Sequence, residues 1–332
     1  MTRISIIGAG SWGTALAILA ARAGHDVKLW SRRDDVVDSI NSRHINSRYL
    51  SAAEIPNTVR ASTELTTCLS GTSLVLLATP SHALRDLLGE MRSGLDQSRI
   101  IVSVAKGIEI ETGKRVSELV DEILGESWSQ RFVCLSGPSF AKEVIGGHPT
   151  AIVAASRNEA SARVVQEVFS FENLRIYTNN DVVGTEFGGS VKNVMAIAAG
   201  MTVGLGFGAN SVAALITRGL AEIARLALSH GGQLETLMGL AGLGDLVLTS
   251  TGSLSRNRFV GEELGKGRSL EEITSGLNEV AEGIKTTRAV KQLAQKAGIE
   301  MPITSVVDSV LYEGTTARDA VTELMTRPLR QE

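Results

Sequence analysis

Six residues near the start of the chain restrict its fold more than any other feature. Residues 8–13 read Gly-Ala-Gly-Ser-Trp-Gly, directly after the apolar run Ile4–Ile7 and before a stretch with helical spacing, Ala15–Arg22. A G-x-G-x-x-G pattern between a strand and a helix is typical of a dinucleotide-binding βαβ unit, because its glycines permit a tight turn, close approach of a pyrophosphate and close packing of helix on strand. A glycine-rich turn without a ligand is the alternative. We expect Gly8, Gly10 and Gly13 to form a dinucleotide site.

The apolar pattern along the chain predicts two domains. Up to Tyr177, short β-branched runs alternate with amphipathic stretches, which is typical of βαβ units and a mostly parallel sheet. After about Asp181 the strand signals stop and the sequence becomes helical. We predict an α/β Rossmann-type doubly wound sheet over residues 1–184 and an all-α domain over residues 185–332. Strands are expected at Ile4–Ile7, Val27–Trp30, Leu74–Leu77, Ile100–Val104, Phe132–Leu135 and Ala151–Ala154, and crossover helices at Ala15–Arg22, Ala83–Met91, Lys114–Leu124 and Ala160–Phe169.

Composition excludes several classes of function. The 332 residues carry a net charge of −3, which provides no broad basic surface for nucleic acid, and no apolar run is long enough to insert into a membrane. The sequence starts on a strand pattern without the regions of a signal peptide, and its two cysteines have no metal-type spacing. The five histidines lack metal-type partners as well. We expect a soluble, cytoplasmic protein that binds small molecules and no metal.

The end of the second expected strand suggests which dinucleotide is bound. An NAD-selective site usually has an acidic residue here for the ribose 2′-hydroxyl, whereas this chain has Arg32 and Arg33. Guanidinium groups can pair bidentately with a 2′-phosphate, so the sequence favours NADPH (or NADP) over NADH (or NAD), which stay possible. Two surface arginines with no ligand, softened by Asp34 and Asp35, are the alternative.

Lys192 is the one cation in an otherwise small and apolar helical stretch, residues 186–199. Gly188, Gly189 and Ala196 share its helix face, so we expect open space beside the ammonium group and a cleft there. Loss of water lowers the proton affinity of a lysine, which would suit Lys192 to exchange a proton with a substrate oxygen. A lysine whose tip reaches solvent from a core helix is the alternative.

Two loops follow strands that should end at the ligand edge of the sheet. Lys106 comes after Ile100–Val104, and residues 136–141 follow Phe132–Leu135 with a serine hydroxyl at the expected helix N-cap. Ligands of open parallel sheets bind beyond the carboxyl ends of the strands, so both loops are candidates. An exposed turn lysine and a serine that only caps a helix are the structural alternatives.

A polar turn in the helical half suits an anion. Ser255, Arg256 and Asn257 place a hydroxyl, a guanidinium and an amide within three residues, and all three can donate to a phosphate. Asp245, among glycines upstream, could accept a hydrogen bond from a substrate hydroxyl. A capping aspartate and a surface turn are the alternatives.

Taken in this order, the motifs resemble those of the bacterial type of NAD(P)-dependent glycerol-3-phosphate dehydrogenase, over nearly the whole chain. They are residues 8–13, 105–107, 135–143, 189–193, 206–210, 241–246, 254–257 and 282–283. The resemblance implies interconversion of dihydroxyacetone phosphate and sn-glycerol 3-phosphate for phospholipid synthesis, in a cytoplasmic homodimer.

The resemblance also implies a role for individual residues. Lys192 would be the catalytic proton donor and acceptor and would contact substrate. The other substrate-binding residues would be Lys106, Gly137, Ser139, Asp245, Ser255, Arg256 and Asn257. The cofactor-binding residues would be Gly8, Gly10, Ser11, Trp12, Gly13, Arg32, Arg33, Tyr49, Lys106, Ala141, Arg256, Val280 and Glu282.

Two other functions fit the same plan. A 3-hydroxyacid dehydrogenase or ketopantoate-type reductase can also combine a Rossmann domain with a lysine on the first helix of the second domain, but its carboxylate substrate accounts less well for the turn at Ser255–Asn257. A non-catalytic NADPH-sensing protein would leave Lys192 without a purpose.

Overall fold

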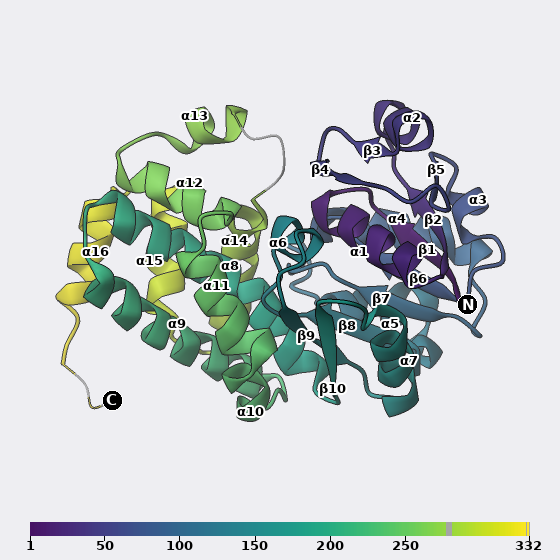
Figure 1. The fold of residues 1–332 in the computed structure, drawn as a ribbon. Helices are drawn as coiled ribbons and strands as arrows, with labels where there is room; N and C mark the ends of the chain where they lie inside the picture. The colour runs from purple at the N-terminus through teal and green to yellow at the C-terminus, as the bar shows by residue number, and fades with distance from the viewer. Residues whose placement is uncertain (277–280, 330, 332) are drawn as a thin grey trace. The chain divides into compact units, whose positions relative to one another are not determined.

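A computed structural model describes residues 1–276, 281–329 and 331 (Figure 1). Its internal contacts divide the chain into two compact units. The first contains residues 1–106 and 114–182, and the second contains residues 107–113 and the chain from Val183 onward. The short segment 107–113 thus belongs with the C-terminal unit although it lies within the N-terminal half of the sequence.

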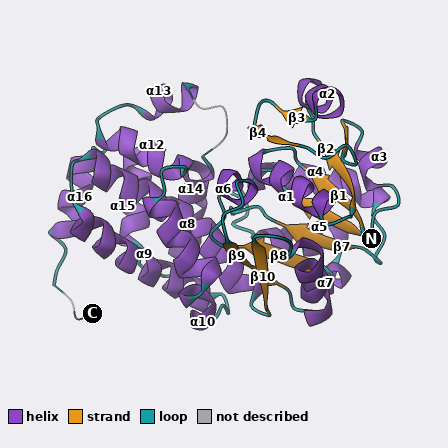
Figure 2. Cartoon of the chain, viewed as in Figure 1, coloured by secondary structure: helices purple, strands orange, loops and turns teal. Residues whose placement is uncertain are grey.

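The first unit is built on one eight-stranded sheet, whose strands are orange in Figure 2. The strand order is β10-β9-β8-β7-β6-β1-β2-β5. Every neighbouring pair is parallel except β8 and β9, which are antiparallel. The strands are β1 (Arg3–Ile7), β2 (Asp26–Trp30), β5 (Arg60–Ser62), β6 (Leu74–Leu77), β7 (Ile100–Ser103), β8 (Phe132–Ser136), β9 (Thr150–Ala155) and β10 (Leu174–Asn179).

The helices of this unit form two groups, as expected for a doubly wound sheet covered on both faces. Helix α1 contacts α6 and α7, whereas α4 contacts α3 and α5. The helices are α1 (Ser11–Arg22), α2 (Asp34–Arg43), α3 (Leu65–Leu69), α4 (Leu84–Met91), α5 (Val116–Leu124), α6 (Ala141–Ile145) and α7 (Glu159–Phe169). A small hairpin, β3 (Ile45–Asn46) and β4 (Leu50–Glu54), follows α2, and short 3₁₀ turns lie at Ser81–Ala83, Arg92–Gly94 and Glu126–Gln130.

The predicted Rossmann-type architecture is confirmed, although several of its elements were not predicted. All six expected strands and all four expected helices are present within a few residues of their predicted ends. Strands β5 and β10, the β3–β4 hairpin and helices α2 and α3 were not anticipated. Helix α2 buries only Val36, Ser39 and Ile40, so its apolar stripe is too narrow to give a periodic signal.

The described part of the second unit is helical and contains no strand, as predicted. Its elements are α8 (Val182–Gly204), α9 (Ala209–Ser229), α10 (Leu234–Met238), a π-helical turn η4 (Leu240–Gly244), α11 (Asp245–Thr251), α12 (Arg256–Gly265), α13 (Leu270–Ser275), α14 (Glu282–Lys296), α15 (Pro302–Tyr312) and α16 (Ala317–Met325). Helix α8 is buried along almost its whole length. It therefore forms the centre of the helical core.

Glycines let helix α12 touch the backbone of α8. A Cβ atom added at Gly261 of α12 would lie 1.9 Å from the carbonyl oxygen of Ile197, and one added at Gly200 of α8 would lie 2.0 Å from that of Arg258. Both distances are far below any real contact, so only glycine allows this crossing. The start of α12 is thereby fixed relative to α8.

None of the described helices is both long and apolar enough to cross a membrane.

Candidate active site

The three glycines of the first loop have different reasons to be glycine. Gly8 has φ +124°, and an added Cβ would lie 2.6 Å from the carbonyl oxygen of Ala78. A Cβ at Gly13 would lie 2.0 Å from the carbonyl oxygen of Gly8. Gly10 is different, because a Cβ there would meet nothing within 4 Å. Packing explains Gly8 and Gly13, while the open space at Gly10, before the N-terminus of α1, fits the approach of a pyrophosphate.

The two arginines after β2 differ in their surroundings. Arg32 is exposed. Arg33 is the N-cap residue of α2 and pairs with Asp35, its Nε lying 2.8 Å from Oδ1 and its Nη2 3.0 Å from Oδ2. The hydrogen bonds of this pair raise the pKa of Arg33 and lower the pKa of Asp35. Arg33 is therefore fully charged and already oriented by a carboxylate.

The other residues predicted to bind the cofactor lie on several elements. Ser11 begins α1, and its Oγ donates to the carbonyl oxygen of Tyr49 at 2.8 Å. Trp12 packs against the core of the first unit, and Ala141 begins α6. Val280 lies outside the described residues.

The loops after β7 and β8 meet at one carbonyl oxygen. Lys106 Nζ donates to the carbonyl oxygen of Gly137 at 2.9 Å, and Ser139 Oγ donates to the same oxygen at 3.1 Å. Gly137 has φ +140°, and a Cβ there would lie 2.9 Å from Cα of Ile152. The loops after the two strands thus bring together a cation and a hydroxyl.

The expected serine N-cap in this loop is wrong. Helix α6 begins at Ala141, its N-cap residue is Phe140, and no side chain caps it. The Ser139 hydroxyl bonds back to Gly137 instead. The reason is that α6 starts later than the sequence suggested.

Lys192 lies in a buried polar cluster within the helical unit. Its Nζ donates to Oδ1 of Asp245 at 2.5 Å and to Oγ1 of Thr249 at 2.6 Å. The exposed fractions are 6% for Lys192, 1% for Asp245 and 4% for Thr249. Lys192 therefore does not reach out to solvent from the core, and its amine lies against a buried carboxylate and a hydroxyl.

Thr249 is a site residue that the sequence analysis left without a role. Its Oγ1 donates to the carbonyl oxygen of Asp245, one helical turn earlier, at 2.7 Å. The lone pairs of Oγ1 are therefore available to accept the hydrogen bond from Lys192. The signal was available in the sequence, because residues four apart on a helix share a face. A hydroxyl four residues after a candidate aspartate therefore identifies a second partner for the lysine.

The open space expected beside Gly188 is absent. A Cβ at Gly188 would lie 2.5 Å from the carbonyl oxygen of Ala241, in the π-helical turn η4 that leads into Asp245. The space beside this glycine is filled by the backbone of Ala241, where we had expected room for a ligand. This close approach brings Asp245 within reach of Lys192.

The predicted anion turn forms the start of α12. Ser255 is the N-cap residue and accepts a hydrogen bond from the N–H of Arg258 at 3.2 Å. Asn257 is buried, and its amide donates to Oδ1 of Asn193 at 3.0 Å and accepts from the N–H of Gly283 at 2.9 Å. Asn257 thus links α12 to the lysine helix α8 and to the first turn of α14.

Arg256 supplies the positive charge of this turn. The residue as a whole is exposed, but surrounding protein removes water from its guanidinium and lowers its pKa, while the carboxylate of Glu282 raises it. An arginine stays charged despite such a shift. Arg256 can therefore contribute a full charge to anion binding.

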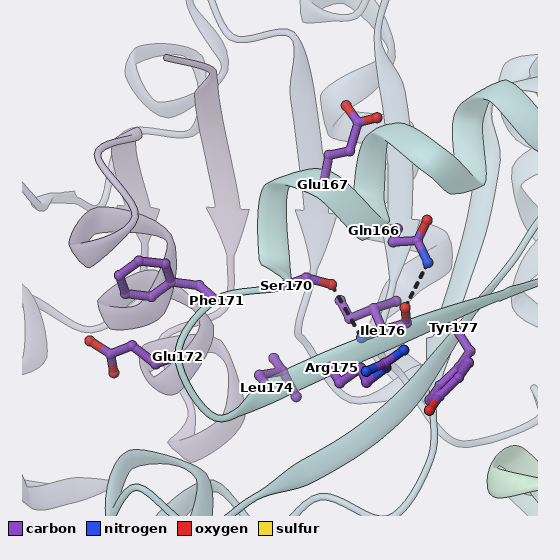
Figure 3. A pocket seen from close by; sticks show the side chains of 9 residues that line it. All are labelled: Gln166, Glu167, Ser170, Phe171, Glu172, Leu174, Arg175, Ile176 and Tyr177. Atoms are coloured by element: carbon purple, nitrogen blue, oxygen red, sulfur yellow. Dashed lines mark hydrogen bonds between the residues drawn. The ribbon is translucent and has the colours of Figure 1, made fainter.

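The surface hollow in Figure 3 is not part of this site. It lies between α7 and β10 in the first unit and is lined by residues 166–167, 170–172 and 174–177. Gln166 donates to the carbonyl oxygen of Ile176 and Ser170 accepts from its N–H, as the dashed lines show. These side chains cover the outer edge of the sheet, and none of the predicted site residues lies there.

A glycine-rich βαβ loop in one unit and a buried Lys-Asp-Thr cluster in an all-helical second unit define a dehydrogenase that uses a nicotinamide dinucleotide. Family models described as the N-terminus and C-terminus of NAD-dependent glycerol-3-phosphate dehydrogenase match residues 3–162 and 181–322. The chain belongs to this family, and the resemblance inferred from its motifs is confirmed.

Individual relatives agree with this assignment. The chain is 53% identical over 334 residues to a glycerol-3-phosphate dehydrogenase [NAD(P)+] of Koribacter versatilis, covering 100% of this chain and 99% of the relative. It is 47% identical to that of Chlorobium phaeobacteroides, covering 99% of each. Among solved structures, glycerol-3-phosphate dehydrogenase from Coxiella burnetii is 42% identical, with a TM-score of 0.94 over 98% of this chain and 99% of that one. A ketopantoate reductase from Ralstonia eutropha, 16% identical with a TM-score of 0.60, shares the fold alone.

Proposed function

We propose that this chain catalyses the reversible reduction of dihydroxyacetone phosphate to sn-glycerol 3-phosphate with NADPH. One observation carries the proposal: in a chain of this family, Lys192 is held in the protein interior by Asp245 and Thr249. An ammonium group fixed by a carboxylate and a hydroxyl can deliver a proton in one direction and recover it in the other.

The chain's own residues would supply the acid–base part of the reaction. When bound, the reduced nicotinamide supplies the hydride to the ketone carbon. Lys192 holds the proton at Nζ that the developing alkoxide takes up, and Asp245 stabilises the ammonium until that transfer. Thr249 fixes the position of Nζ, because its own hydrogen is given to the Asp245 carbonyl.

Substrate and cofactor would be held by the residues named from the sequence. The residues proposed to bind substrate are Lys106, Gly137, Ser139, Asp245, Ser255, Arg256 and Asn257. Arg256 would contribute charge to the phosphate, and Ser255 and Asn257 would hold that turn in shape through their own hydrogen bonds.

The cofactor proposal rests on the loop and the arginine pair. Gly8, Gly10, Ser11, Trp12 and Gly13 would surround the pyrophosphate. Arg32 and Arg33 would pair with the 2′-phosphate and give a preference for NADPH. The further cofactor contacts proposed are Tyr49, Lys106, Ala141, Arg256 and Glu282.

The test is to follow loss of the reduced nicotinamide absorbance with dihydroxyacetone phosphate, using the purified chain and its Lys192→Ala variant. We expect turnover with the parent and a loss of about 10² to 10⁴ in kcat in the variant, with NADPH binding retained. Near-normal turnover in a folded variant would contradict the role of Lys192. Equal kcat/KM for NADPH and NADH would contradict the cofactor preference.

The same assay decides between the rival functions. Ketopantoate and a 3-keto acid should be reduced far more slowly than dihydroxyacetone phosphate, because a carboxylate lacks the dianionic charge that the turn at Arg256 suits. A non-catalytic NADPH sensor would oxidise NADPH with none of the three ketones.

We further propose that the protein acts in the cytoplasm as a homodimer and supplies glycerol 3-phosphate for phospholipid synthesis. Sedimentation equilibrium of the purified chain tests the dimer. A single species of monomer mass at micromolar concentration would contradict it.

A further inference from the structure

One buried amide connects the β3–β4 hairpin to the glycine-rich loop of the first unit. Asn46 has no exposed surface. Its Nδ2 donates to the carbonyl oxygen of Ala9 and to Oγ1 of Thr14, both at 2.8 Å, and its Oδ1 accepts the N–H of Tyr49 at 3.2 Å. Both amide hydrogens and the oxygen are used inside the protein, so Asn46 acts on the loop and does not contact a ligand itself.

The hairpin that carries Asn46 is firmly anchored. Leu50 and Ile55 are buried in the core of the first unit. The N–H of Ile55 donates to the carbonyl oxygen of His44 at 2.8 Å, which closes the base of the hairpin. A second connection to the loop is the hydrogen bond from Ser11 Oγ to the Tyr49 carbonyl oxygen. The hairpin is therefore a fixed support for the loop.

The carbonyl oxygen that Asn46 binds determines where the next N–H points. The Ala9–Gly10 peptide bond is trans, so the C=O of Ala9 and the N–H of Gly10 point in opposite directions across one rigid plane. Asn46 holds the C=O toward the protein interior. The N–H of Gly10 must then point away from Asn46, at the loop position where an added Cβ meets nothing within 4 Å.

Amide groups that point outward at the start of a helix are what a pyrophosphate binds. A loop peptide with its oxygen turned the other way would present a negative dipole to the phosphates and weaken binding. Since a glycine can adopt either orientation at little cost, the loop itself does not fix this peptide.

We propose that Asn46 is a positioning residue for the dinucleotide: it orients the Ala9–Gly10 peptide so that the loop binds the pyrophosphate. The inference rests on the proposed function, because it requires the loop to bind a dinucleotide. It adds a residue of the hairpin to the cofactor site, and nothing in the G-x-G-x-x-G pattern indicates it.

The test measures the Kd for NADPH and NADH by quenching of tryptophan fluorescence in the Asn46→Ala and Asn46→Asp variants. Aspartate keeps the size of Asn46 and an oxygen for the Tyr49 N–H, but as a carboxylate it cannot donate to Ala9. We expect both variants to raise both Kd values by at least about 10-fold, the order expected when a buried carbonyl loses its donor. The ratio of the two Kd values should stay the same, since Arg32 and Arg33 are unchanged.

A matched control separates positioning from general loosening of the fold. Thr14→Val removes the other hydrogen bond of the Asn46 amide and leaves the bond to Ala9. It should lower the melting temperature but change the Kd for NADPH by no more than about 2-fold. In the Asn46 variants, kcat at saturating cofactor should also stay near the parent value, so that the effect appears in KM.

Three outcomes decide between the possibilities. Parental Kd values in a folded Asn46→Ala or Asn46→Asp variant overturn the proposal. An equal rise in Kd in Thr14→Val overturns it as well, because the effect would then come from lost stability. If the parent protein binds neither dinucleotide, the proposed function itself has failed.

Discussion

Removing the cation from the buried Lys192–Asp245 pair should destabilise the helical unit as well as stop catalysis. Asp245 is 1% exposed, and its Oδ1 lies 2.5 Å from Lys192 Nζ. A Lys192→Met variant leaves this carboxylate in the protein interior without its partner, which typically costs about 3 to 5 kcal/mol. Methionine has a similar length and can fill the same space, so the loss is chiefly electrostatic.

Adding Asp245→Asn tests that reasoning. Asparagine removes the unpaired charge, so the double variant should recover stability although it carries two changes. Its kcat should stay as low as that of Lys192→Met, since neither has a proton to give. Urea unfolding followed by far-UV circular dichroism is the suitable assay, because the tryptophans at 12, 30 and 128 all lie in the first unit and the second unit is helical. A double variant no more stable than Lys192→Met would refute the electrostatic explanation.

Three more predictions follow from glycine contacts and one buried acid. Gly10→Ala should raise the Kd for NADPH by about 10-fold or more without lowering the melting temperature. Gly13→Ala should lower the melting temperature, because its Cβ would lie 2.0 Å from a backbone oxygen. Fluorescence titration measures the Kd and calorimetry the melting temperature. Gly261→Ala should separate α12 from α8, raise the KM for dihydroxyacetone phosphate and lower the free energy of unfolding by about 1 to 3 kcal/mol or more. An unchanged KM would contradict this. Burial raises the pKa of Glu222, which caps α15, from 4.5 to about 7. Between pH 4.5 and 7 the folded state therefore keeps a proton that the unfolded state has lost. The free energy of unfolding should fall by on the order of 3 kcal/mol as the pH rises through this range. Urea titrations of Glu222→Gln should lack this pH dependence.

The sequence predicted best where a local pattern has one structural cause. The β-branched runs became strands, and the first-loop glycines lie where a strand turns into a helix. Strand β10 was missed because only two buried apolar residues, Leu174 and Ile176, carry its alternation of buried and exposed positions. The β3–β4 hairpin was missed for a similar reason, since β3 has only two residues.

Within the helical unit, a glycine or an asparagine can either serve a ligand or pack against the protein itself, and the sequence alone does not separate these two roles. Gly188 suggested room for a ligand beside Lys192, but the room is taken by the backbone at Ala241. Asn257 was predicted to bind phosphate, and the structure adds that its amide joins three helices. In both cases the sequence showed what the residue is able to contact. It did not show the actual partner, which lies far away in the sequence.

The distances along the chain explain why α8 is the element on which this chemistry depends. Lys192 bonds Asp245, which lies 53 residues later in the chain, and Thr249, which lies 57 residues later. Asn193 bonds Asn257, which lies 64 residues later. Adjacent residues of one buried helix thus fix two separate segments, and glycines bring the backbones of both segments against it. Backbone contacts leave little freedom for adjustment, because no side chain can change rotamer to absorb a shift. Alanine at these glycines should therefore disturb the geometry at Lys192 more than substitutions at large side chains of the same core, such as Phe187→Leu, which can repack. Comparable kcat values in Gly188→Ala and Phe187→Leu would show that the lysine does not depend on this backbone contact.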